Sequence, residues 1–191
     1  MRKLIAGMQT SIDGKIEGPE GYADWVDAWS DHYDVIDRVD ACLLGAGMYP
    51  GYEAYWTAIQ NAPREVLAPT GKPPTPGEVE YARFAARTPH FVLSSTMSSA
   101  LWPTTGFLRG LDDVAALKEQ PGKDIYVVGG ARTVTGLIDA GLLDELRLTV
   151  HPLIAGEGKP LFATMERRRG LELRKVEQLD GGQVSLIYGI G

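Results

Sequence analysis

Residues 124–162 read DIYVVGGARTVTGLIDAGLLDELRLTVHPLIAGEGKPLF, and this stretch decides the fold. It opens with the apolar run IYVV, which is typical of a buried strand. Gly129 and Gly130 follow, and a helix is predicted from about Arg132, with Gly141 at its C-terminal end. A helix that begins directly after a strand and two glycines leaves backbone N–H groups free at its positive end. The arrangement predicts either a plain tight turn or a corner that binds an anion.

A second strand follows this helix. Leu146, Leu148 and Val150 alternate with polar residues, which gives the strand one apolar face, and Pro152 ends it. Further along, residues 171–190 predict two strands joined by a tight turn. Strands that alternate with helices and then end in a hairpin predict an α/β domain with a mixed sheet.

The order of residues from Gly129 to Phe162, GG followed by LIDAGLLDELRL and then PLIAGEGKPLF, resembles the dihydrofolate reductase-like reductases. That group includes the reductase domain of bifunctional riboflavin-biosynthesis proteins (the RibD C-terminal domain) and stand-alone dihydrofolate reductase-like proteins. The run FAARTPHFVLS at residues 84–94 is more similar to the stand-alone group. The resemblance covers nearly the whole chain and implies a single domain, residues 1–191, with a dihydrofolate reductase-like fold. Such a fold has a central, mostly parallel mixed sheet flanked by helices, with an antiparallel C-terminal hairpin.

Composition limits the classes of function. The chain has 191 residues, of which 44% are hydrophobic and 23% charged, and these values suit one soluble globular domain. A net charge of −6 argues against a general binder of nucleic acids or membrane surfaces. No apolar run reaches the roughly 18 residues of a transmembrane helix, and no signal peptide is evident. Cys42 is the only cysteine, and no metal-binding pattern is recognisable. We therefore expect a cytoplasmic enzyme.

The resemblance implies NADPH as the cofactor. Its pyrophosphate would lie between two strand-to-helix glycine corners, Gly45–Gly47 and Gly129–Thr133, and the peptide bond between the two glycines of the second corner would be cis. Hydroxyl groups of residues 94–96 would contact the adenosine 2′-phosphate. Ala46 stands where dihydrofolate reductases commonly carry a basic residue, so the choice between NADPH and NADH stays open. The implied cofactor-binding residues are Ala6, Ile12, Gly14, Gly45, Gly47, Met48, Ser94, Ser95, Thr96, Val128, Gly129, Gly130, Ala131, Arg132 and Thr133.

The resemblance also implies a substrate-binding acid. Residues 24–38 carry apolar residues at helical spacing with many aspartates between them, most of which we expect on a solvated face. In dihydrofolate reductases the acid lies on the equivalent helix, a few residues after a tryptophan, and Trp25 is such a residue. Asp27 and Asp31 are both candidates, with Asp13 in the loop beside them. A buried carboxylate there would have a raised pKa, which suits a proton donor near neutral pH.

These features predict an NADPH-dependent oxidoreductase that transfers a hydride to a small pterin-like or pyrimidine-like heterocycle. Dihydrofolate and 5-amino-6-(5-phosphoribosylamino)uracil, an intermediate of riboflavin biosynthesis, represent the two substrate types. Riboflavin-pathway reductases typically carry a lysine where this chain has Gly7 and a glutamate where it has Val128, which disfavours the uracil. The alternative is a nucleotide-binding protein of the same fold without reductase activity. An edge strand within the C-terminal pair, together with the resemblance, predicts a homodimer.

Overall fold

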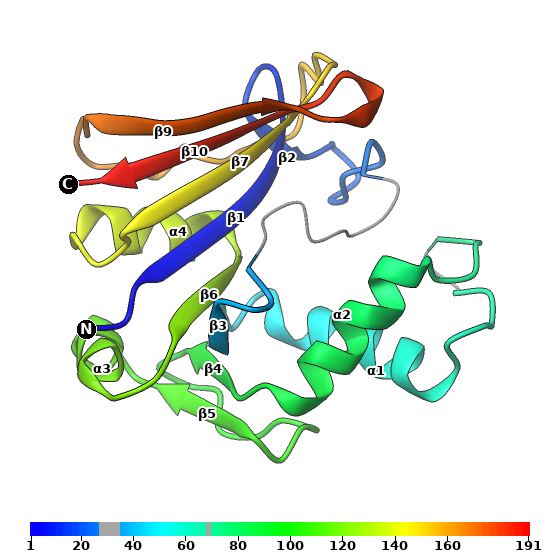
Figure 1. Cartoon of the computed structure of the whole chain (residues 1–191), viewed down its shortest axis with the longest axis horizontal. Coiled ribbons are helices and arrows are strands. Elements are labelled where there is room, and N and C mark those ends of the chain that lie inside the picture. The colour runs from blue at the N-terminus through cyan, green and yellow to red at the C-terminus, as the bar shows by residue number, and fades with distance from the viewer. Residues whose placement is uncertain (27–34, 68–69) are drawn as a thin grey trace.

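The computed structural model describes residues 1–26, 35–67 and 70–191. In these residues, one sheet of eight strands runs in the order β5-β4-β3-β6-β1-β7-β10-β9 (Figure 1). Its strands are β1 (Leu4–Ser11), β3 (Val39–Gly45), β4 (His90–Leu93), β5 (Thr105–Leu108), β6 (Asp124–Gly129), β7 (Glu145–His151), β9 (Leu171–Gln178) and β10 (Val184–Ile190). The helices are α1 (Tyr49–Asn61), α2 (Pro76–Arg87), α3 (Leu111–Glu119) and α4 (Ala131–Asp139). A separate two-stranded sheet pairs β2 (Lys15–Glu17) with β8 (Lys159–Pro160).

The strands from β5 to β7 in this order are parallel, whereas β10 is antiparallel to both β7 and β9. Parallel strands that are covered on both faces need continuous apolar runs, and β1 and β3 supply LIA and ACLL. The mostly parallel mixed sheet and its antiparallel C-terminal hairpin confirm the predicted α/β fold. Within the described ranges, no helix combines the length and the apolar character that a membrane span requires.

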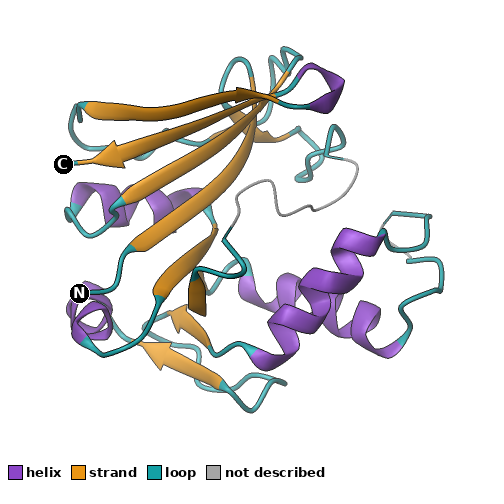
Figure 2. Cartoon of the chain, viewed as in Figure 1, coloured by secondary structure: helices purple, strands orange, loops and turns teal. Residues whose placement is uncertain are grey.

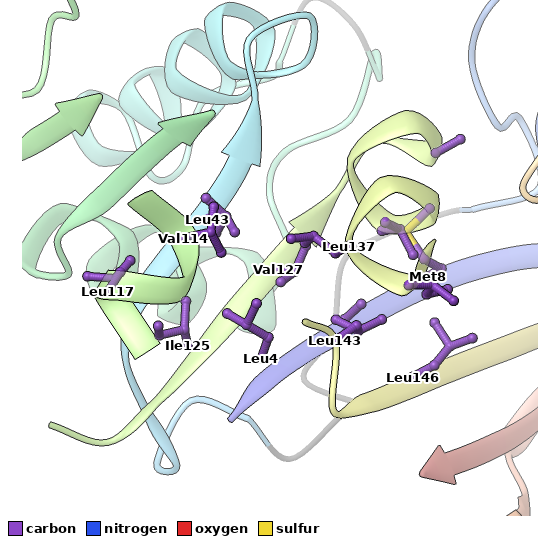
Figure 3. Close-up of a cluster of buried hydrophobic side chains, with 14 of the residues drawn as sticks. Leu4, Met8, Leu43, Val114, Leu117, Ile125, Val127, Leu137, Leu143 and Leu146 are labelled. Carbon is purple, nitrogen blue, oxygen red and sulfur yellow. The ribbon is translucent and has the colours of Figure 1, made fainter. Parts of the chain in front are cut away.

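Alternate positions of the strands enter two cores on opposite faces of the sheet. On one face, α3 and α4 cover a cluster that includes Leu4, Leu43 and Val127 (Figure 3). On the other face, α1 and α2 pack against each other and cover Ile5 and Tyr126 (Figure 2). Each fully buried aliphatic or aromatic side chain stabilises the fold by about 1.5–3 kcal/mol, so the two cores hold the strand ends in fixed positions.

The polar side of β7 is buried as well. Arg147, Thr149 and His151 are each at most 5% exposed, although alternation with apolar residues would by itself predict a solvated face. Arg147 pairs with Glu145, with 2.6 Å between Nη2 and Oε1, as a buried charge requires. This side of β7 adjoins β1, where Gly7 is in register with Arg147. The buried polar side chains of β7 therefore lie on a strand that is paired directly with β1.

Candidate active site

A cavity of about 970 Å³ lies at the carboxyl ends of the parallel strands β4, β3, β6 and β1. Most of the predicted cofactor residues line it, namely Gly45, Gly47, Met48, Ser94, Ser95, Thr96, Val128, Gly129, Gly130, Ala131, Arg132 and Thr133. Ala6, Ile12 and Gly14 are not part of this lining. Ala6 is fully buried in the core under α4, and Ile12 is 62% exposed. The fold thus brings three distant segments of the chain to one cavity.

The corner between β6 and α4 consists of bare backbone. Gly129 and Gly130 have φ angles of +144° and +92°, which other residues rarely adopt, and α4 begins at Ala131. The predicted cis peptide bond between these glycines is wrong, because the described residues contain no cis peptide bond. Two consecutive positive φ angles make the turn with trans bonds instead. Residues 131–133 line the cavity, so the first N–H groups of α4 are available to a phosphate there.

The corner between β3 and α1 lies against this first corner. A Cβ placed on Gly45 would overlap Thr133 Oγ1, so any larger residue here would force the Thr133 side chain to move. The turn is closed by a hydrogen bond of 3.1 Å from Met48 N to the Gly45 oxygen, and α1 begins at Tyr49. Two helices therefore start beside backbone whose glycines carry no side chains of their own, which is the geometry that suits a pyrophosphate.

The turn after β4 supplies hydroxyl groups. Ser94 Oγ accepts hydrogen bonds from the N–H groups of Thr96 (3.3 Å) and Met97 (2.9 Å), and so it fixes the turn. Arg109 braces the same turn, because its Nη1 donates to the Ser94 and Met97 carbonyl oxygens at 3.0 and 2.7 Å. Ser95 and Thr96 are exposed. Ser94 is thus a turn-forming residue, and the two hydroxyls that follow it are the better candidates to bind an anion.

The wall formed by α1 and α2 is aromatic. Tyr52, Tyr55, Trp56 and Tyr81 line the cavity here, together with Tyr126 from β6. Neighbouring rings meet at an angle, with centroids 5.0 Å apart for Tyr55 and Trp56 and 4.5 Å apart for Trp56 and Tyr81. None of the residues of α1 and α2 that line the cavity is a lysine or an arginine. This wall therefore suits a flat, uncharged ring and offers no cation to an acidic group.

His90 lies behind the aromatic wall and leads to a pH prediction. The residue is fully buried, and its Nε2 lies 3.1 Å from the Tyr52 hydroxyl. Burial lowers the pKa of His90 from 6.5 to about 4, although the nearby Glu53 charge acts in the opposite direction. The unfolded chain therefore binds more protons than the folded chain between these two pKa values. Stability should fall as the pH drops through this window, by about 3 kcal/mol in total.

Chemical denaturation of the wild type and of His90→Gln at several pH values between about 7 and 4.5 measures this effect. Glutamine does not titrate, so the stability of the variant should decline less steeply with falling pH, whatever its stability at neutral pH. Parallel declines in the two proteins would contradict the prediction.

Asp13 joins two loops. Its Oδ1 accepts hydrogen bonds from the Ser11 hydroxyl (2.7 Å) and Ala155 N (2.9 Å), and its Oδ2 accepts one from Gly156 N (2.9 Å). These hydrogen bonds lower the pKa of the exposed Asp13 carboxyl to about 2. Asp13 is therefore not the buried carboxylate for which a raised pKa was expected, and it is also absent from the cavity lining. Asp13 ties the loop after β1 to the loop after β7.

The tied loops bring a charged pair to the mouth of the cavity. β2 and β8 pair antiparallel, with Glu17 in register with Lys159. Lys159 Nζ lies 3.3 Å from Glu17 Oε1, and both residues line the cavity. The two side chains are 50% and 30% exposed, so their mutual attraction contributes little to stability. Their position makes them available to a ligand at this end of the cavity.

The cavity lining includes residues that the sequence-based prediction missed. Gln9, Glu17 and Lys159 line the cavity, and no local motif marked them as site residues. The one available signal was a polar Gln9 directly after the apolar run of β1, and Thr10 and Ser11 are polar as well. Asp27 and Asp31, the two predicted acids, lie outside the residues that the structure describes, so their role stays a prediction.

The family model of the RibD C-terminal domain matches residues 2–185 of the chain. The chain belongs to this family. Curated relatives match this RibD C-terminal domain over 98% of the chain. The uncharacterized protein YyaP of Bacillus subtilis (strain 168) is 30% identical over 193 aligned residues, which cover 98% of this chain and 94% of YyaP.

Solved structures share the fold of this RibD C-terminal domain. A Shewanella sp. PV-4 protein, provisionally assigned to riboflavin biosynthesis, has a TM-score of 0.70 at 20% identity, with 99% of each chain covered. Dihydrofolate reductase from Enterococcus faecalis, complexed with NADP(H) and RAB-propyl, has a TM-score of 0.64 at 16% identity, with 99% of this chain and 96% of that chain covered. At these identities the likeness demonstrates the fold alone.

Proposed function

We propose that this protein is an NAD(P)H-dependent reductase of a pterin-like or pyrimidine-like heterocycle. The observation that carries the proposal is the pair of glycine corners, where Gly45, Gly129 and Gly130 leave bare backbone beside the starts of two helices. A bound nicotinamide cofactor would supply the hydride, so the protein needs to bind, orient and exclude water rather than to provide a nucleophile. Membership of the RibD C-terminal domain family supports a reductase over a protein that only binds nucleotides.

The order of the strands supports a division of the cavity. The hydroxyl turn follows β4 and the glycine corners follow β3 and β6, so a dinucleotide would extend along these three strand ends. Beyond β6 lies β1, whose Gly7 and Gln9 line the remaining end, with Glu17 and Lys159 at its mouth. Among the described lining residues, only Arg132 and Lys159 carry a positive charge. Lys159 pairs with Glu17 at this end, so we propose that the ring of the substrate is recognised here mainly through apolar and uncharged polar contacts.

The source of the proton belongs to the same proposal. The pKa of Asp13 is lowered to about 2, so its carboxyl group carries no proton near neutral pH. Both of its oxygens also accept hydrogen bonds within the loops, so it is poorly suited to act as a proton donor. Asp27 and Asp31 remain the proposed acids, on the strength of the family resemblance.

Titration of the protein with NADPH and with NADH tests the proposal, with tryptophan fluorescence as the signal. Saturable binding of either cofactor is expected, followed by cofactor oxidation with one member of a panel of dihydrofolate, dihydrobiopterin and the aminouracil riboflavin precursor. Absence of saturable binding of both cofactors would refute the reductase. Binding without oxidation by any panel member would favour the alternative, a nucleotide-binding protein without reductase activity.

We also propose a homodimer formed through the C-terminal strands. Every residue of β9 is exposed, and this edge strand carries Leu171, Leu173 and Val176 at 40%, 54% and 60% exposure. An exposed edge with large apolar side chains is an unstable surface for a monomer, and a second copy would cover it. Light scattering should give the mass of a dimer at micromolar protein, and Leu173→Glu combined with Val176→Glu should give the mass of a monomer. A monomeric wild type would refute this arrangement.

A further inference from the structure

Gln9 is a polar side chain at the end of the cavity farthest from the hydroxyl turn. It lies on β1, is half-buried and lines the cavity. The strand order places β1 between β6, which ends in a glycine corner, and β7, which carries His151. Gln9 therefore lies next to the glycine corner after β6. It is on the side of that corner where Glu17 and Lys159 also line the cavity.

The amide of Gln9 is held by a histidine. His151 is 4% exposed, and its Nε2 lies 2.7 Å from Gln9 Oε1. On the other side of the ring, the Gln183 amide nitrogen on the approach to β10 lies 3.5 Å from His151 Nδ1, at the long limit of a hydrogen bond. An amide N–H that donates to Nδ1 leaves the proton of the neutral ring on Nε2, which then donates to Gln9 Oε1. Two strands and the turn before β10 thus contribute to one hydrogen-bonded row.

This row leaves one group of Gln9 for a ligand. Its carbonyl oxygen is engaged by His151, and within the described part of the chain its amide nitrogen has no hydrogen-bond partner. The nitrogen can donate two hydrogen bonds. A partly buried donor without a partner gains most from a ligand that offers an acceptor, such as a ring carbonyl or an unprotonated ring nitrogen.

We propose that Gln9 is a specificity-determining residue that donates a hydrogen bond from its amide nitrogen to an acceptor of the substrate ring. His151 is the positioning residue that fixes the direction of this amide. The assignment rests on the proposed function, because it requires the substrate ring to occupy the β1 end of the cavity. It narrows the substrate class to heterocycles with a carbonyl or ring nitrogen at the edge that meets β1.

Binding without turnover tests the assignment. The probes are pterin and lumazine, which are flat rings with such acceptors, and their dissociation constants are measured by calorimetry with the protein saturated with NADP⁺. Gln9→Met keeps the length of the side chain and removes the donor, so it should weaken the better-bound ring about 10-fold or more. The dissociation constant of NADP⁺ should stay within about twofold, because the glycine corners are untouched.

A matched pair of variants tests the role of His151. His151→Leu removes the donor to Gln9 and should weaken ring binding about 3- to 10-fold, whereas His151→Gln can still donate from its amide and should bind within about twofold of the wild type. Circular dichroism and thermal unfolding confirm that each variant is folded. A merely structural histidine would give two equally weak variants, which would overturn its positioning role.

The outcomes separate this inference from the proposed function. Ring affinity unchanged in Gln9→Met, or a wild type that binds NADP⁺ but neither ring, would overturn the role of Gln9 while leaving the cofactor site intact. A loss of NADP⁺ affinity in Gln9→Met would also overturn it, because Gln9 would then serve the dinucleotide. A wild type that binds neither NADP⁺ nor NADPH would refute the proposed function itself.

Discussion

A Gly130→Val variant is expected to bind NADPH at least about 100-fold more weakly than the wild type. Gly130 has a φ of +92°, a region that a β-branched residue adopts only at a cost of about 1–3 kcal/mol. The nearest atom to a Cβ at this position is Thr133 Oγ1 at 3.5 Å, so the side chain would meet little protein. It would instead occupy the cavity beside residues 131–133, where the first N–H groups of α4 are available to a phosphate.

Gly136→Val is the matched control for this experiment. Gly136 lies in the same helix, does not have a positive φ, and has no atom within 4 Å of its Cβ position. This variant should keep NADPH affinity within about twofold and should lose at most about 1 kcal/mol of stability. Gly130→Ala serves as a second test if valine prevents folding, because it carries the same backbone strain with a smaller side chain. Normal NADPH affinity in a folded Gly130→Val protein would contradict the role of the corner.

Local sequence patterns predicted the parts of the site that depend on neighbouring residues. The corner at Gly129 and Gly130 was predictable because an apolar strand, two glycines and a helix follow each other directly, and the structure has them at residues 124–139. The second corner, at Gly45, was predictable for the same reason. The cis bond was a geometric detail carried over from the family, and the two positive φ angles replaced it.

The sequence could not predict contacts between distant segments. Asp13 was expected to be an acid at the substrate, but two of the groups that bind its carboxylate, Ala155 N and Gly156 N, come from the far end of the chain. The same applies to Glu17 and Lys159, which meet only because β2 pairs with β8. Local periodicity does not show which distant strands pair. The residues at the mouth of the cavity could therefore be identified only in the structure.

The burial of the polar side of β7 was also not predictable from the sequence. His151 alternates with apolar residues, and alternation predicts that the polar face of a strand meets water. In the folded chain His151 lies beside Gln9 of β1 and is buried. A polar residue on an interior strand was therefore the signal of a site, and it could be interpreted only once its partner on β1 was known.

Gly158→Ala is expected to separate β2 from β8 and to damage the substrate end of the cavity. Gly158 has a φ of +114°, and a Cβ there would overlap the carbonyl oxygen of Glu17. The overlapped atom belongs to the backbone, so it can yield only if the whole of β2 moves away. We expect a loss of stability of about 2–4 kcal/mol, from the strained φ and the displaced strand together.

Gly156→Ala provides the comparison, because it carries the strain without the overlap. Gly156 has a φ of +71° and no atom within 4 Å of its Cβ position, and its N–H would still bind Asp13. Its expected cost is about 1 kcal/mol. Denaturant unfolding measures both variants, and titration with NADPH and with pterin measures the two ends of the cavity. Gly158→Ala should weaken pterin far more than NADPH, since Glu17 and Lys159 lie at the end of the cavity proposed for the substrate ring, and the glycine corners are not expected to move. Equal free energies of unfolding for the two variants would contradict the expected displacement of β2. An equal loss of affinity for NADPH and pterin in Gly158→Ala would contradict the view that the β2–β8 pair shapes only the end proposed for the substrate.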